Sequence, residues 1–207
     1  MAVLGALAIA FSAILVRLAD QPPSTAAFFR CAYAVPVLGL LAWREDRRFG
    51  ARPRRTRMLA ALAGVLFAAD LVFWHHAIAN VGAGLGTVLG NLQVALVPFV
   101  AWFFLKEHPG RRVLASLPLV ITGIVLISGV LEHGAYGRTP GLGVVFGVLT
   151  GLSYAAFILL LRASGADLRR PAGPLFDATL VAALATLAAG WPLGELRLEP
   201  SWPAHGW

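Results

Sequence analysis

A carboxylate and an indole inside long apolar runs are the first groups that could do chemistry. Asp70 lies about midway along the apolar run 58–79, and Trp74 follows it one helical turn later on the same face. An ionisable side chain at membrane depth usually faces a cavity or a partner, because burying it costs free energy. Three roles stay open for Asp70: binding a proton or a substrate, pairing with an arginine such as Arg30, or donating a hydrogen bond as a protonated acid.

Two amides, Asn91 and Gln93, lie in the next apolar run. Amides in hydrocarbon need hydrogen-bond partners, so these two either bind polar groups of a substrate or hold their helix to a neighbour. Asn91 is expected nearer to a cavity.

Adjacent His75 and His76 point in directions about 100° apart on a helix, and they lack the spacing of paired metal ligands. We expect no metal site and no cofactor.

The elements that position these groups are predicted to be membrane helices. The chain has 207 residues, of which 58% are hydrophobic and only 13% charged. In a typical soluble domain about 45–50% of the residues are apolar and about 25% are charged. A soluble fold of this size could not bury so much apolar surface, and a disordered chain would be more polar. Cys31 is the only cysteine, which excludes a disulfide scaffold.

Seven apolar runs approach the roughly 20 residues that a spanning helix needs. They cover residues 2–18, 26–43, 58–79, 84–105, 113–130, 141–161 and 175–193. Their length and the absence of strict alternation exclude the strands of a membrane barrel. The sequence predicts an all-α polytopic membrane protein with about seven transmembrane helices.

Most of the 17 basic residues lie in the loops after the second, fourth and sixth runs. Basic loops stay in the cytoplasm, which predicts a multi-pass membrane protein with a cytoplasmic N-terminus. Most of the basic residues that give the formal net charge of +7 lie in these short gaps. They form no basic face interleaved with aromatic residues, so no nucleic-acid partner is expected; the expected partners are the lipid bilayer and a small-molecule substrate.

Two sets of glycines recur at four-residue spacing, which lets another helix backbone approach closely. They are Gly82, Gly86 and Gly90 in one set and Gly143, Gly147 and Gly151 in the other. We interpret both as helix-packing positions, within one chain or across a homodimer.

The sequence also contains a faint internal repeat, because a shift of 145 residues places the first run on the sixth, with Arg17 on Arg162. Five spans separate the two starts, so the repeat would be inverted, as in secondary transporters.

Three segments resemble the EamA-like family of the drug/metabolite transporter superfamily. They read ADLVFWHHAI at 69–78, VGAGLGTVLGNLQ at 81–93 and AWFFLKEHP at 101–109. The family usually ends this last helix with a Leu-Gly-Glu-Arg-Pro-like motif. Glu107 and Pro109 match that motif, whereas Lys106 and His108 replace its glycine and arginine.

The resemblance implies ten helices in two inverted five-helix units around a central cavity. It assigns residues 1–131 to a first five-helix repeat and residues 140–207 to an incomplete second repeat with two helices and an outer loop, so we expect the chain to end before its fold is complete. Its cavity residues would be Asp70, Trp74, Asn91 and Gln93. The implied function is a secondary transporter of small metabolites, an exporter of amino acids or related compounds that works by alternating access. The chain has no GxxxxGK[ST] motif, so a gradient would drive transport, with Asp70 as the proton-coupling residue.

Other function classes fit the residues less well. The single lysine, Lys106, lies at a helix end and cannot form a retinal Schiff base in the last span. An intramembrane serine protease would need GxSxG, but Ala155 stands where the second glycine belongs, so we expect no enzyme. A non-transporting membrane scaffold or sensor subunit with seven helices is the alternative to a transporter.

Overall fold

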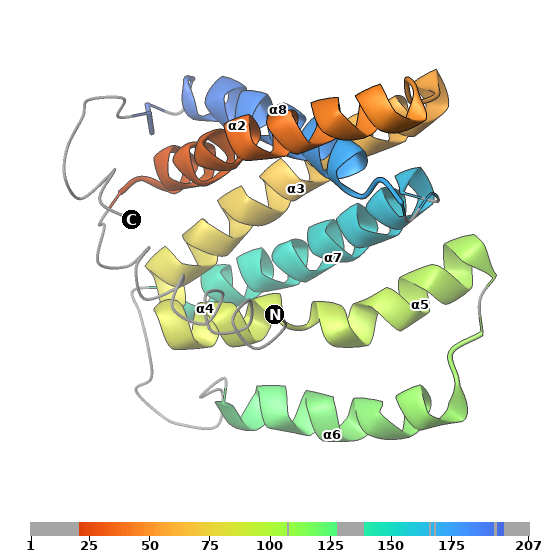
Figure 1. The fold of residues 1–207 in the computed structure, drawn as a ribbon. Coiled ribbons are helices and arrows are strands. Elements are labelled where there is room, and N and C mark those ends of the chain that lie inside the picture. Colours follow the sequence, from red (N-terminus) through yellow and green to blue (C-terminus); the bar gives the residue numbers. More distant parts are fainter. Residues whose placement is uncertain are drawn as a thin grey trace.

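The computed structural model describes residues 21–106, 108–127, 139–165, 167, 169–192 and 194–196, and every regular element among them is a helix (Figure 1). The helices are α2 (Pro23–Phe49), α3 (Arg54–Val81), α4 (Ala83–Gly90), α5 (Gln93–Leu105), α6 (Arg111–Ile127), α7 (Pro140–Ser164) and α8 (Ala172–Gly190). The predicted all-α class is confirmed. The predicted span 2–18 lies outside the described residues.

Four of the described helices are long and apolar enough to cross a membrane. They are α2, α3, α7 and α8, which cover the predicted runs 26–43, 58–79, 141–161 and 175–193. The other three are shorter, with 8, 13 and 17 residues in α4, α5 and α6. The count of seven spans therefore stays a prediction.

The predicted run 84–105 is not one helix. It divides into α4 and α5 at Asn91 and Leu92, where each backbone N–H donates to a carbonyl three residues earlier, Val88 and Leu89 respectively. The sequence Gly-Asn at 90–91 permits this break, because both residues disfavour a helix interior. Each half is shorter than the roughly 20 residues of a complete span.

Helices α2 and α8 lie side by side, and α3 packs against both α7 and α8 (Figure 1). Small side chains allow this close packing. Ala27, Cys31 and Ala182 are buried where α2, α3 and α8 meet, and Ala63 and Ala178 are buried where α3 meets α8. Helix α6 lies at the edge of the bundle, against α4 and α5.

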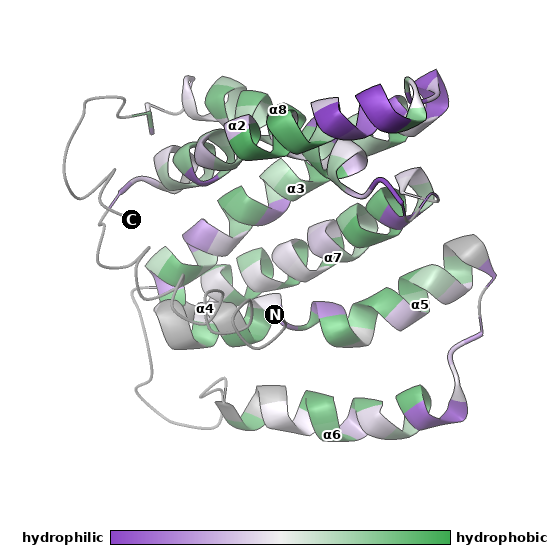
Figure 2. Cartoon of the chain, viewed as in Figure 1, coloured by the Kyte–Doolittle hydropathy of each residue, from purple (hydrophilic) through white to green (hydrophobic). Residues whose placement is uncertain are grey.

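The three basic loops of the sequence lie at one end of the bundle. The α2–α3, α5–α6 and α7–α8 connections are all at the right of Figure 1. Figure 2 shows hydrophilic residues concentrated there, above all where α2 ends, while apolar residues predominate along the helices. We call this the basic end, and the other end the far end.

Gly64 tests the close approach of α3 to α8. A Cβ at this position would collide with the carbonyl oxygen of Ala178 and crowd Val181. We expect Gly64→Ala to lower the free energy of unfolding by roughly 1–3 kcal/mol, measured by thermal unfolding in detergent. Gly123→Ala is the matched control, since a Cβ there meets nothing within 4 Å. Equal stability of the two variants would contradict this packing.

Candidate functional site

A cavity of about 180 Å³ lies between α2, α3, α7 and the break between α4 and α5. Ten residues line it: Arg30, Phe67, Asp70, Leu71, Trp74, Gly90, Asn91, Gln93, Thr150 and Tyr154. The four substrate-binding residues expected from the sequence, Asp70, Trp74, Asn91 and Gln93, are thus brought together at one place. We call this space the central cavity.

Helix α3 supplies one wall of the central cavity because four of its residues share a helix face. They are Phe67, Asp70, Leu71 and Trp74. Asp70 is 6% exposed, and its carboxylate makes no hydrogen bond or ion pair within 4.0 Å to the residues that the structure describes. A buried carboxylate without such a partner is suited to bind a proton or a cationic group.

Helix α2 contributes a cation to the same cavity. The guanidinium carbon of Arg30 lies 5.5 Å from the centroid of the Trp74 ring, which is within the range of a cation–π contact. The Arg30 side chain is exposed, and it forms no ion pair within 4.0 Å with an acid among the described residues, so the pairing with Asp70 that the sequence left open is not seen. Its guanidinium lies over an aromatic face at the cavity wall.

Helix α7 contributes two lining residues that sequence reasoning missed, Thr150 and Tyr154. The Thr150 hydroxyl is buried and has no hydrogen-bond partner among the described residues. Their four-residue spacing on an apolar helix was the available signal, since it places both on one face. Gly90 completes the contact, because a Cβ there would lie 3.4 Å from side-chain atoms of both Thr150 and Trp74.

Neither of the two histidines lines the central cavity. His75 is buried, and its Nδ1 lies 2.6 Å from the carbonyl oxygen of Leu71. His76 stacks on Phe146 with ring centroids 5.1 Å apart. Across the described residues, no group of three His, Cys, Asp or Glu side chains could hold a metal ion.

The glycines with four-residue spacing differ in their surroundings. The α7 set packs tightly: Cβ atoms at Gly143 and Gly147 would collide with Val81 and Leu89, and one at Gly151 would lie 3.1 Å from Leu96. In the other set, a Cβ at Gly86 would lie 3.0 Å from Ile78, and Gly90 faces the central cavity. Gly82 has φ +86° and ends α3, a conformation that favours glycine.

The sequence model of the EamA-like transporter family matches residues 1–129. The chain belongs to the EamA-like transporter family. An uncharacterized protein of Pseudomonas aeruginosa is 30% identical over 201 residues, which are 95% of this chain and 66% of that protein. No solved structure matches the chain. The family and the long apolar helices together make this a multi-pass membrane protein of the drug/metabolite transporter type.

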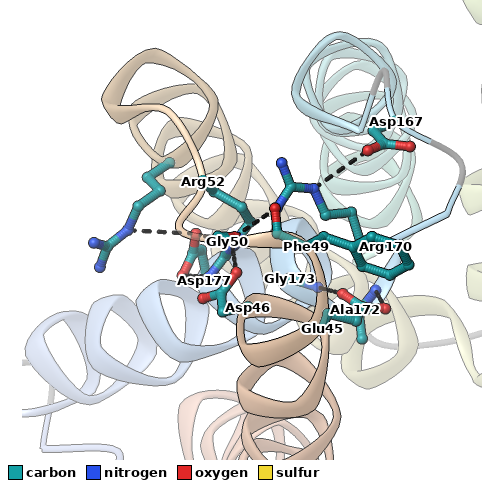
Figure 3. Close-up of polar contacts among 11 residues, drawn as sticks. Glu45, Asp46, Phe49, Gly50, Arg52, Asp167, Arg170, Ala172, Gly173 and Asp177 are labelled. Carbon is teal, nitrogen blue, oxygen red and sulfur yellow. Dashed lines mark hydrogen bonds and ion pairs between the residues drawn. The ribbon is translucent and has the colours of Figure 1, made fainter.

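A buried ion pair joins the helices of this EamA-like protein at the basic end (Figure 3). Arg52 donates from Nη1 to Oδ2 of Asp177 at 2.6 Å, and from Nε to Asp46 at 3.2 Å. The Arg52 side chain is 5% exposed and that of Asp177 10%. The pair connects the α2–α3 loop to α8 across 125 residues of sequence.

Glu45 and Arg170 extend the polar contacts at the basic end (Figure 3). The Glu45 carboxylate accepts hydrogen bonds from the backbone N–H groups of Ala172 and Gly173 at 3.0 and 2.8 Å, so a side chain of α2 caps the start of α8. Arg170 donates to the Gly50 carbonyl at 2.7 Å and pairs with Asp167 at 3.3 Å.

Asp167 lies in the α7–α8 loop and stays ionised at neutral pH. Hydrogen bonds from the side chain and backbone of Arg169 hold the pKa of this carboxyl below its usual value. The carboxylate is therefore available to pair with Arg170 over the whole neutral range.

A second polar cluster connects α2 and α3 to the segment after α8 at the far end. Ser24 donates to the Glu195 carboxylate at 2.6 Å, and Thr25 donates to the Glu195 carbonyl at 2.5 Å. His76 Nε2 lies 3.6 Å from the same carboxylate. Sequence reasoning missed both clusters, because their partners are far apart in the chain and lie in loops or beside apolar runs.

The buried pair at the basic end yields a test by two variants. Asp177→Asn leaves the Arg52 charge buried with less compensation, so we expect the free energy of unfolding to fall by about 3 kcal/mol. The double variant Arg52→Met/Asp177→Leu removes both charges and is expected to recover most of that loss. Thermal unfolding in detergent measures both. Equal loss in the single and the double variant would show that packing, not charge, dominates at this position.

Proposed function

We propose that this chain is part of a secondary transporter of the bacterial inner membrane that exports small metabolites, amino acids or related compounds, by alternating access. The observation that carries the proposal is the central cavity, which gathers a carboxylate, a guanidinium, two amides and an aromatic ring at membrane depth. Irregular backbone at that depth is tolerated where it lines a cavity. The irregular backbone between α4 and α5 is such a case, because Asn91 at this break lines the central cavity.

The lining groups suit a small zwitterion. Asp70 can receive an ammonium group, and Arg30 can receive a carboxylate. The start of α5 at Gln93 adds a helix N-terminus, which favours anionic groups in transporters with discontinuous helices. Trp74 and Tyr154 offer aromatic surface for an apolar side chain. The volume of about 180 Å³ matches a small metabolite better than a drug-sized ligand.

Alternating access requires each end of the bundle to open in turn. The Arg52–Asp177 ion pair at the basic end and the Glu195 contacts at the far end are the polar contacts that would break and re-form. Because basic loops stay inside, we assign the basic end and the N-terminus to the cytoplasm. We place residues 1–131 in a first five-helix unit and residues 140–207 in an inverted second unit, in a monomer or a homodimer.

Asp70→Asn tests proton coupling. The variant keeps the shape of the side chain but cannot ionise, so we expect transport driven by a pH gradient to fall by about tenfold or more. The assay follows a panel of radiolabelled amino acids in proteoliposomes with and without an imposed pH gradient.

Asp167→Asn is the control, since that carboxylate lies between α7 and α8, outside the central cavity, and its side chain is 33% exposed. Unchanged transport in Asp70→Asn would remove Asp70 from the coupling mechanism. Absence of transport by the folded wild-type protein would favour a scaffold or sensor role.

A further inference from the structure

A second, larger cavity lies in the groove between the first turns of α3 and the facing side of α8, at the basic end. Its volume is about 610 Å³. Its lining residues are Arg52, Arg54, Arg57, Met58, Ala61, Asp177, Leu180 and Val181. None of these residues lines the central cavity. We call it the α3–α8 groove.

The rim of the α3–α8 groove carries positive charge that the protein does not neutralise. Arg52 is already paired with Asp177 at 2.6 Å. Arg57 approaches that same carboxylate only to 4.0 Å, and its side chain is 64% exposed. Arg54 is exposed and makes no hydrogen bond or ion pair with the residues that the structure describes. The lining residues of the groove thus include three arginines but a single carboxylate, Asp177.

The wall below this rim is apolar. Met58 and Ala61 follow Arg54 and Arg57 by one helical turn on α3, and α8 contributes Leu180 and Val181. Exposed apolar side chains continue the surface toward the middle of the bundle. These are Leu62 and Val65 on α3 and Leu184 on α8. The groove thus changes from cationic to apolar along the membrane normal, as the two ends of a phospholipid require.

We propose that the α3–α8 groove binds one anionic phospholipid, with its phosphate at Arg54 and Arg57 and an acyl chain along Met58 and Val181. Guanidinium groups bind phosphate oxygens through paired hydrogen bonds. The first turn of α3 has no side-chain cap, so its backbone N–H groups add to the attraction for an anion. Basic pockets between membrane helices bind anionic headgroups in this way. The inference does not depend on what the protein transports.

Native mass spectrometry of the purified protein tests this proposal. The protein is released from nanodiscs of phosphatidylglycerol or of phosphatidylcholine, at 0.15 M salt, and the retained lipids are counted. We expect one retained phosphatidylglycerol and no retained phosphatidylcholine. Arg54→Gln/Arg57→Gln is expected to weaken retention about 30-fold, the factor for two basic side chains at an anionic surface.

The matched control removes two charges outside the groove. Arg47 and Arg48 lie at the end of α2 and contact the rings of Trp43 and Phe49. Arg47→Gln/Arg48→Gln is expected to change retention by less than about threefold, because salt screens charges that do not touch the lipid. Equal loss in both double variants would show diffuse attraction and overturn the proposal. Equal retention of phosphatidylcholine would also overturn it.

A further variant tests the apolar wall of the groove separately from its arginines. Ala61→Phe keeps every arginine but fills the apolar wall, so we expect it to abolish retention while the Gln variants keep the wall open. Circular dichroism and a single elution peak confirm that each variant is folded. Retention by Ala61→Phe at the wild-type level would overturn the groove as the site. Displacement of the lipid by millimolar inorganic phosphate would show a free-anion site instead.

Discussion

The close contact of α3 with α7 and α8 is the constraint on which the rest of the described structure depends. Where Gly64 meets the Ala178 carbonyl, no side chain separates the two helices. This contact fixes the rotation of α3 about its axis. Rotation in turn decides which face carries Asp70 and Trp74 toward α7 and α2. A larger residue at position 64 would turn the cavity wall as well as separate the helices.

Sequence reasoning located the four long helices α2, α3, α7 and α8, because apolar length is the main signal of a membrane span. It also named Asp70, Trp74, Asn91 and Gln93, which the fold brings to one cavity. A polar side chain in an apolar run is a clear signal of a site in the sequence, since burying it in the membrane costs free energy. Thr150 escaped notice because a hydroxyl in a membrane helix commonly bonds to its own backbone, and the sequence does not show that this one has no such partner.

The sequence could not predict the break at Asn91 or the pairing of Arg52 with Asp177. A run that is apolar from 84 to 105 has the hydropathy of one continuous helix, and the break depends on neighbours that supply a cavity on one side. The partner of Arg52 is 125 residues away, beyond any pattern of local spacing. The six other arginines around it in the same stretch, 44–57, made Arg52 look like a topology signal alone. The buried ion pair with Asp177 thus gives Arg52 a structural role besides its place in a basic loop.

The hydrogen bonds to both ends of α8 have a mechanical consequence. Glu45 caps its first residues, and Ser24 and Thr25 hold the segment that follows it through Glu195. Both sets of bonds come from α2, nearly a helix length apart. A sliding or twisting of α8 relative to α2 would strain the two sets at once. While both sets of bonds are formed, they therefore resist any shift of α8 relative to α2.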